Sequence, residues 1–384
     1  MTAIQSTAPE EPVRYIFVDG LRGIAAMMVV VFHFHENLFP SVHEWLPKWI
    51  SAVCLNGNLG VEIFFVLSGF VIAHSVRDGE RSARYLLRFG LRRSIRLDPP
   101  LWITIAVELL LMRLSLLFFP HLATAIPTWQ TVAANVMYLQ RFLGLPNVLP
   151  VFWSLTYEVQ FYAVLVSGLV VWHRIPAAYR PDAARNILFL GAFYLSIAIW
   201  LGALPLPFPG LFIDRWFQFA LGIVAWCCVS KRISVGIFIG FCATVVAAIL
   251  ALHAPAYRAH SSEVAVAAAM LIVSAAALGR MQSWLCGRAS QFLARISYSL
   301  YLVHLSVGWR LISLVRTKAG PSLNPIVASA TLVAAILCSI AAAYVMHAVV
   351  EQPSLKLARH IRLPRRNSGE GRDALLTIRG LQRN

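Results

Sequence analysis

The chain has 384 residues, of which 59% are hydrophobic and 13% are charged, and its mean hydropathy is +0.69. Soluble domains carry about a quarter charged residues, so this composition excludes a soluble globular protein and predicts a surface that faces lipid. The formal net charge of +16 would elsewhere suggest nucleic acid, but the distribution of the basic residues along the chain argues against that partner.

Apolar runs long enough to cross a bilayer recur along the chain, since about 20 apolar residues span a hydrocarbon core about 30 Å thick. A polar N-terminal tail, 1–13, is predicted to be disordered in the cytoplasm, and a basic C-terminal tail, 356–384, is predicted to be cytoplasmic as well. Between them we expect one transmembrane domain, 14–355. The sequence therefore predicts an all-α polytopic membrane helix bundle of about ten spans, at 20–40, 58–76, 98–119, 151–172, 187–204, 216–230, 235–253, 263–279, 296–315 and 325–350.

Basic residues are distributed unevenly between the segments that join these runs. With the N-terminus in the cytoplasm, 25 of the 33 lysines and arginines fall on the cytoplasmic side and 6 on the opposite side, as the positive-inside rule requires. An even number of spans then places both termini in the cytoplasm. The arginine-rich loop 77–97 is predicted to form an amphipathic helix that lies against the membrane. The basic charge thus reflects topology, and we expect membrane lipid, not nucleic acid, as a partner.

The first apolar run contains two ionisable residues, Arg22 and His33, eleven positions apart. At about 100° per residue, eleven steps return close to the same helix face, and at about 1.5 Å per residue they separate the two residues by about 16 Å in depth. With Arg22 at the membrane edge, His33 lies near the middle of the bilayer. Ionisable groups at that depth indicate function; the alternative is a structural histidine bonded to a neighbouring helix.

Glu158 lies about seven residues in from the outer end of the fourth run, which is roughly 10 Å of depth. At that depth a carboxylate can orient the His33 imidazole, as a general base requires. The alternative for Glu158 is a polar contact between packed helices. Four further side chains are candidates for binding the acceptor substrate, although the last of them has an equal claim to a structural role: Trp153, Tyr157, Glu62 and His304.

Arg93 and Arg96 are three residues apart and share a face if their segment is helical, with Arg92 adjacent. Guanidinium groups offer planar, bidentate donors that suit phosphates. The alternative is simple anchoring at the membrane surface. Asp19 precedes Arg22 by three residues and is expected to form an ion pair with it.

Several common signatures are missing from the sequence. It contains no Walker loop, no dinucleotide-binding fingerprint, no GxSxG elbow and no HExxH motif. Its six cysteines show neither a disulfide framework nor zinc-type spacing. We therefore expect no metal and no permanently bound cofactor.

Short motifs along the chain match one family, and their order and spacing are more specific than any motif alone. Arg22 and His33 match an Arg/Lys-x10-His motif, and Arg93 and Arg96 match an Arg-x-x-Arg motif. The matching stretches are 18–26, 60–70, 92–100, 153–162, 297–304 and 350–353. Together they resemble the acyltransferase 3 family, integral-membrane bacterial O-acyltransferases that modify O-antigens, exopolysaccharides, nodulation factors and macrolides. Two positions depart from the family, with Glu62 where Asp is commoner and Asp98 where many relatives carry an aromatic residue.

The resemblance implies transfer of an acyl group, usually acetyl, from cytoplasmic acyl-CoA (acetyl-CoA) to a hydroxyl of a carbohydrate or secondary-metabolite acceptor. It also implies the bacterial cytoplasmic (inner) membrane as the location. On this basis we expect His33 to be the general base, Glu158 to orient it or bind the acceptor, and five residues to hold or guide the donor: Arg22, Arg93, Arg96, Arg92 and Asp19. Many relatives carry a C-terminal esterase-like domain. We expect this chain to work without one, either alone or by passing the acyl group to a separate protein.

Two other classes of function compete with the enzyme. A proton-coupled transporter or flippase of a glycan or small metabolite would use Glu158 and His33 as a proton relay, and it would need no CoA. A sensory or scaffold membrane protein would contain structural histidines only. The combination of the two arginine motifs with the 153–162 stretch favours the enzyme.

Overall fold

The computed structural model describes residues 14–43, 46–76, 79–80, 82–118, 125–176, 179, 181–320 and 323–364. The predicted N-terminal tail and residues 365–384 of the predicted C-terminal tail lie outside these ranges. Within them the fold is all-α, as predicted. The helices are α1 (Ile16–Asn37), α2 (Lys48–Leu55), η1 (Gly57–Leu59), α3 (Gly60–Val76), α4 (Ala83–Phe118), α5 (Trp129–Val136), α6 (Phe152–Arg174), α7 (Asp182–Leu201), η4 (Phe212–Arg215), α8 (Trp216–Val229), α9 (Val235–Ala251), α10 (Ala256–Ala277), α11 (Arg288–His304), the π-helical turn η5 (Leu305–Trp309), α12 (Arg310–Ala319), α13 (Pro325–Met346), the π-helical turn η6 (His347–Glu351) and α14 (Gln352–His360).

Nine helices in the described part of the chain are long and apolar enough to cross a membrane, counting continuous segments such as Arg288–Ala319 as one. They correspond to nine of the predicted runs, so the chain is a multi-pass membrane protein. The remaining run forms α9, whose 17 residues extend about 25 Å, less than a typical core of about 30 Å. The cytoplasmic location of both termini depends on α9 crossing the membrane, and it stays a prediction.

The arginine-rich loop predicted at 77–97 is largely the beginning of α4, which corrects the expected separate surface helix. α4 has 36 residues and continues through Pro99 and Pro100, so it begins well before the predicted run at 98–119. These prolines cannot donate backbone hydrogen bonds. Just before them, Tyr298 donates to the Leu97 carbonyl at 2.8 Å, and Tyr138 donates to the Asp98 carboxylate at 2.9 Å, so tertiary hydrogen bonds hold this part of α4.

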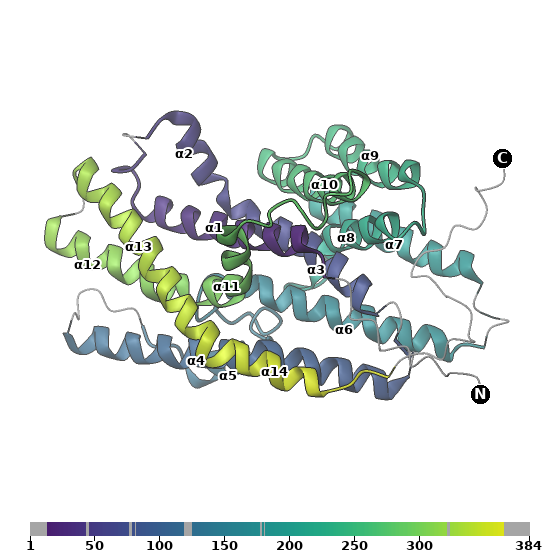
Figure 1. Cartoon of the computed structure of the whole chain (residues 1–384), viewed down its shortest axis with the longest axis horizontal. Coiled ribbons are helices and arrows are strands. Elements are labelled where there is room, and N and C mark those ends of the chain that lie inside the picture. Colours follow the sequence, from purple (N-terminus) through teal and green to yellow (C-terminus); the bar gives the residue numbers. More distant parts are fainter. Residues whose placement is uncertain are drawn as a thin grey trace, which may run out of the picture.

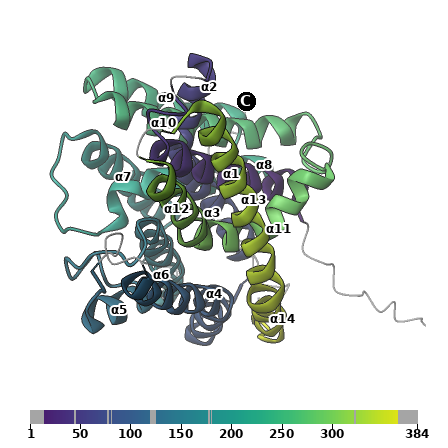
Figure 2. The same cartoon turned by 90° about the vertical axis from the view of Figure 1, so that its left-hand side faces the viewer.

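Helices α1 and α3 lie near the middle of the bundle. Seen end-on in Figure 2, α1 and α3 lie between α9 and α10 on one side and α4 and α6 on the other. In Figure 1, α1, α4 and α6 run along the long horizontal axis, and the first residues of α1 and of α4 lie towards the same, right-hand side. Arg22 and the arginines in the first half of α4 are therefore brought to one side of the molecule.

α1 and α11 pack in direct contact, and Gly23 makes this possible. A Cβ atom at Gly23 would lie only 2.5 Å from the backbone nitrogen of Ala294. Ten residues further along each helix, His33 meets His304, with 3.2 Å between ring nitrogens. Two contacts with equal spacing show that the helices run parallel and in register, so the close packing at Gly23 fixes the position of His304 beside His33.

Candidate active site

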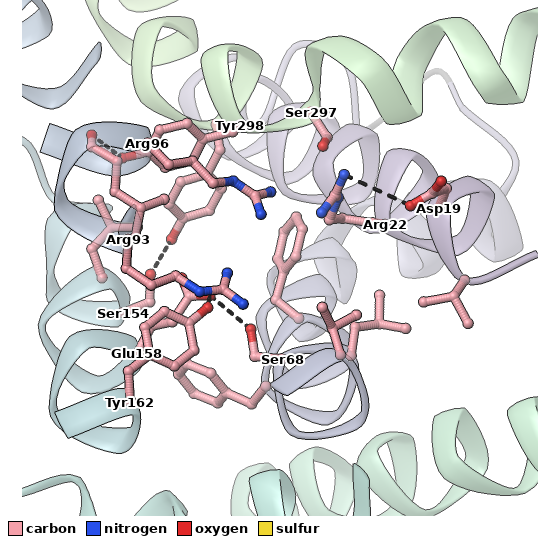
Figure 3. A pocket seen from close by; sticks show the side chains of 18 residues that line it. Asp19, Arg22, Ser68, Arg93, Arg96, Ser154, Glu158, Tyr162, Ser297 and Tyr298 are labelled. Atoms are coloured by element: carbon pink, nitrogen blue, oxygen red, sulfur yellow. Dashed lines mark hydrogen bonds and ion pairs between the residues drawn. The ribbon is translucent and has the colours of Figure 1, made fainter. Parts of the chain in front are cut away.

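A cavity of about 100 Å³ lies between α1, α3, α4, α6 and α11, and we call it the arginine cavity. Its lining includes Arg22, Arg93 and Arg96, whose guanidinium groups point into the same space in Figure 3. Arg93 and Arg96 share a face of α4, as their spacing predicts, and Arg22 faces them from α1. Asp19 and Glu158 also line this cavity, so five of the predicted site residues meet here.

Positive charge is in excess in the arginine cavity, where three guanidinium groups face two carboxylates. The predicted ion pair between Asp19 and Arg22 is long, at 3.9 Å, and Asp19 accepts a shorter hydrogen bond from Arg14 at 2.6 Å. The Arg93 guanidinium lies 4.9 Å from the centroid of the Tyr162 ring, a cation–π contact. This contact leaves the N–H groups at the edge of the guanidinium plane suited to an anion such as phosphate.

Glu158 belongs to the arginine cavity, and this position corrects the expected contact with His33. Its Oε1 accepts hydrogen bonds from the hydroxyls of Ser68, at 2.7 Å, and Tyr162. Helix rise gives the depth of a residue, which is what the sequence argument used, but it does not say which neighbouring helices that residue faces. The carboxylate faces α3 and α4, whereas His33 contacts α11.

A second cavity, of about 410 Å³, is lined by His33, and we call it the histidine cavity. Glu62, Trp153 and Tyr157 line it as well, so three of the four predicted acceptor-binding residues share one space with the predicted base. Arg22 and His33 therefore line different cavities at two depths along α1. Further charged and aromatic side chains complete the histidine cavity, among them Arg141, Asp214, Arg215 and Tyr257.

Glu62 is held by a buried ion pair with Arg215, which the sequence argument did not identify. The Arg215 Nη1 donates to Glu62 Oε1 at 2.9 Å, and the Ser261 hydroxyl donates to the same oxygen at 2.7 Å. The Arg215 guanidinium also stacks on the Trp200 ring, 3.5 Å from its centroid. Because buried charges need a partner and further hydrogen bonds, Glu62 has a clear structural role in the wall of the histidine cavity.

The hydrogen bonds of the two paired histidines define which nitrogens carry protons. His304 Nδ1 lies 3.0 Å from the Leu300 carbonyl, which only accepts, so this nitrogen is the donor and Nε2 of the neutral ring is an acceptor. His33 Nδ1 lies 2.9 Å from the Val29 carbonyl and 3.2 Å from His304 Nε2. With two acceptors around it, His33 Nδ1 carries the proton, and Nε2 of neutral His33 holds a lone pair.

Tyr301 lines both cavities, so they meet at this side chain. Its hydroxyl is 2.6 Å from the Ser154 hydroxyl and donates to the Val151 carbonyl at 3.0 Å. Its ring lies 6.1 Å from the His304 ring, centroid to centroid. Tyr301 therefore lies between the arginine cavity and the histidine pair.

Two predicted site residues take other positions. Among the described residues that line the two cavities, Arg92 does not occur, because one step along α4 turns it about 100° away from Arg93. His304 is completely buried and contacts His33 instead of lining the histidine cavity. The expectation that His304 binds the acceptor is therefore wrong, and its position is that of a partner of the predicted base.

No role was predicted from the sequence for Ser68, Tyr162, Tyr301 or Arg215. One of them left a usable signal, since Tyr301 precedes His304 by three residues and must share its helix face. Arg215 stands directly before an apolar run, a position typical of an interfacial charge, and its pairing with Glu62 in another span has no local signature.

Comparisons with known proteins agree with the motifs. A sequence profile of the acyltransferase 3 family, described as an acyltransferase domain, matches residues 15–344. The acyltransferase MdmB of Streptomyces mycarofaciens is 25% identical over 385 residues, covering 91% of this chain and 94% of that protein. The peptidoglycan O-acetyltransferase OatA of Listeria monocytogenes is 30% identical over 203 residues, and the O-acetyltransferase OatA of Staphylococcus aureus is 30% identical over 186 residues.

The two OatA matches cover 50% and 45% of this chain but only 29% and 27% of the OatA proteins themselves. No solved structure matches the chain. The profile, however, extends over nearly all of the helical bundle and includes both cavities, from Arg22 on α1 to Tyr301 on α11. The chain belongs to the acyltransferase 3 family.

Proposed function

We propose that this protein is a membrane O-acyltransferase that moves an acyl group, with acetyl as the expected one, from acyl-CoA to a hydroxyl of a carbohydrate or secondary-metabolite acceptor. Two kinds of relative support O-acyl transfer, since they are named O-acetyltransferase and acyltransferase. The observation that carries the proposal is the meeting of the arginine cavity and the histidine cavity at Tyr301. One cavity suits an anionic donor, and the other contains a base.

The arginine cavity is the proposed donor site. Its volume of about 100 Å³ is smaller than the roughly 300 Å³ of a typical ligand pocket, so it admits only a narrow part of CoA. Phosphates near Arg22, Arg93 and Arg96 would leave the nucleotide at the entrance and let the thin pantetheine arm extend inward. The arm then follows α1 towards His33, about 16 Å from Arg22 by helix rise.

The histidine cavity is the proposed acceptor site. Aromatic side chains such as Trp153 and Tyr157 offer flat apolar faces with polar edges, and Asp214 and Arg141 add hydrogen-bonding charges to the same wall. Two acidic and two basic residues line this cavity, so their formal charges cancel. A neutral, polyhydroxylated molecule suits such a lining better than a strongly charged one. The positive-inside prediction places this cavity towards the outer side of the membrane.

The chemistry follows from the protonation of the histidine pair. His33 Nε2 takes the proton of the acceptor hydroxyl while the hydroxyl oxygen attacks the thioester carbonyl. The tetrahedral intermediate then collapses, the carbon–sulfur bond breaks, and the CoA thiolate leaves with the proton from His33. The products are an ester and free CoA, and His33 returns to its neutral form. The bond between His33 Nδ1 and the Val29 carbonyl keeps the ring in the reactive tautomer throughout.

Permeabilised cells of the source organism, supplied with acetyl-CoA labelled in its acetyl group, provide the test. We expect the label to enter an alkali-labile ester in parent cells and in a deletion strain that carries the restored gene, but not in the deletion strain itself. Mass spectrometry of surface polysaccharides and extracted metabolites then identifies the acceptor by the loss of one acetyl group. Equal labelling of parent and deletion strains would contradict the proposal.

The transporter alternative makes a different use of the same residues, because a proton relay needs Glu158 and His33 within reach of each other. In the described structure Glu158 bonds Ser68 and Tyr162, while His33 bonds Val29 and His304. This separation supports the enzyme. Substrate flux that depends on the proton gradient and continues without acyl-CoA would support the transporter instead.

A further inference from the structure

A second intramembrane ion pair lies outside both cavities and takes no part in the proposed reaction. Glu108 on α4 is buried, and it accepts two hydrogen bonds from Arg310, at 2.7 Å and 2.9 Å. The Ser306 hydroxyl donates to Glu108 at 2.6 Å, and Arg310 also donates to the Ser306 carbonyl at 3.0 Å. Glu108, Ser306 and Arg310 therefore form one closed network, which we call the Glu108 cluster.

Such a cluster is expensive to place in a membrane protein. A carboxylate and a guanidinium lose their hydration when they leave water, and their mutual attraction repays that loss only with good geometry and extra hydrogen bonds. The bidentate pairing and the Ser306 hydroxyl meet that requirement. A helix pair of ordinary apolar side chains would pack without this cost, so the cluster is expected to hold something specific in place.

What the cluster holds is an irregular turn. Ser306 belongs to the π-helical turn η5, Leu305–Trp309, and Arg310 is the first residue after it. A π-helical turn contains an extra residue relative to an α-helix, is rare, and occurs often at functional sites. The Arg310 side chain donates a hydrogen bond to the Ser306 carbonyl within this turn.

This turn packs against α1 at the position of the proposed base, His33. His304, the residue directly before it, contacts His33, and the Trp309 ring at its end lies edge-on to the His33 ring, 6.3 Å between centroids. Gly308 packs so closely on α1 that a Cβ atom there would lie 2.0 Å from the Phe34 ring. If the turn relaxed to a regular α-helix, its later residues would rotate by about 100°, and Gly308 and Trp309 would move away from α1.

We propose that Glu108, Ser306 and Arg310 are positioning residues for His33. By fixing the π-helical turn, they keep Trp309 against the His33 ring and Gly308 against Phe34 of α1, so that His33 Nε2 is held in place for the acceptor hydroxyl. This inference rests on the proposed role of His33 as the base. The cluster itself touches neither substrate.

The test compares Glu108→Gln with the double variant Glu108→Gln/Arg310→Gln, in the permeabilised-cell assay with labelled acetyl-CoA. Glu108→Gln leaves the Arg310 charge without its counterion, so it lowers stability as well as positioning. The double variant removes that charge and is expected to recover thermal stability while keeping the catalytic defect. Ser313→Ala, on the adjoining helix α12 and outside the cluster, is the matched control for Ser306→Ala.

We expect both Glu108 variants to lower kcat at least about tenfold, since misplacement of a catalytic group by about 1 Å costs up to about a hundredfold. The KM for acetyl-CoA should stay unchanged, and the acid limb of the pH–rate profile should move, because His33 has lost a fixed neighbour. Ser306→Ala should show a smaller effect of the same kind, and Ser313→Ala none. A purely structural cluster predicts the opposite for the double variant, namely a normal kcat and a normal pH profile once stability returns.

The single variant Glu108→Gln is the one most at risk of misfolding. If it does not fold, the double variant and Ser306→Ala carry the test alone, measured on protein that elutes as a single species. The variant His33→Ala distinguishes a failure of the proposed function from a failure of the positioning role. Normal transfer by His33→Ala would overturn the proposed function, whereas an inactive His33→Ala beside a fully active double variant would overturn only the positioning role.

Discussion

Replacing Arg93 with alanine removes one of the three guanidinium groups of the arginine cavity and leaves Arg22 and Arg96 in place. Arg93 is half-buried, and its contact with the Tyr162 ring orients it towards the cavity. A hydrogen bond to a charged group contributes about 1.5–3 kcal/mol, and about 1.4 kcal/mol corresponds to a factor of ten in affinity. We therefore expect the Kd for acetyl-CoA to rise about ten- to a hundredfold, measured by calorimetry on the purified protein in lipid nanodiscs.

Two controls make this prediction specific. S-acetylpantetheine carries the same thioester without the phosphates and the nucleotide, so its affinity should be the same for Arg93→Ala as for the unchanged protein. Arg113→Ala removes an exposed arginine near the other end of the same helix, and it should leave acetyl-CoA binding intact. The phosphate role of Arg93 would be refuted by an unchanged acetyl-CoA Kd, or by an equal loss of affinity for S-acetylpantetheine.

Three further changes test the packing around the two cavities. Arg215→Met leaves Glu62 buried without its counterion and should destabilise the protein by about 3–5 kcal/mol, which a lower Tm would show. The double variant Arg215→Met/Glu62→Leu should regain most of that stability. Equal stability of the single and the double variant would contradict the ion-pair account. Gly23→Ala should lower both Tm and acetyl transfer because α1 must move away from α11, whereas Gly168→Ala, which meets open space, should change neither. Tyr301→Phe should reduce acetyl transfer several-fold without changing acetyl-CoA binding, and an unaltered transfer rate would argue against a role at the junction of the cavities.

The helical architecture was predictable because it depends on local sequence properties. Apolar length alone locates the spans, since lipid leaves the backbone few alternatives to a helix. The course of α4 was not predictable in the same way. Pro99 and Pro100 indicate a helix start when read locally, but α4 continues through them, and the residues just before them accept hydrogen bonds from Tyr138 and Tyr298, which are distant in sequence.

In the candidate site, too, local features were predictable from the sequence and contacts between distant helices were not. The spacing of Arg93 and Arg96 predicted that both would face one cavity, and helix periodicity is sufficient for that conclusion. The partner of His33 was not predictable from depth alone, because depth fixes the height of Glu158 in the membrane but not the helices that it faces. His304 became that partner through the parallel packing of α1 and α11, which depends on the close approach at Gly23.

The central claim is that His33 performs the chemistry while the arginine cavity binds the donor. The most direct measurement is acetyl-CoA binding and acetyl transfer in parallel for His33→Gln, a substitution that keeps a polar side chain of similar size. The account predicts an unchanged acetyl-CoA Kd and transfer reduced to the level of the deletion strain. Acetyl transfer at the normal rate by His33→Gln would contradict it.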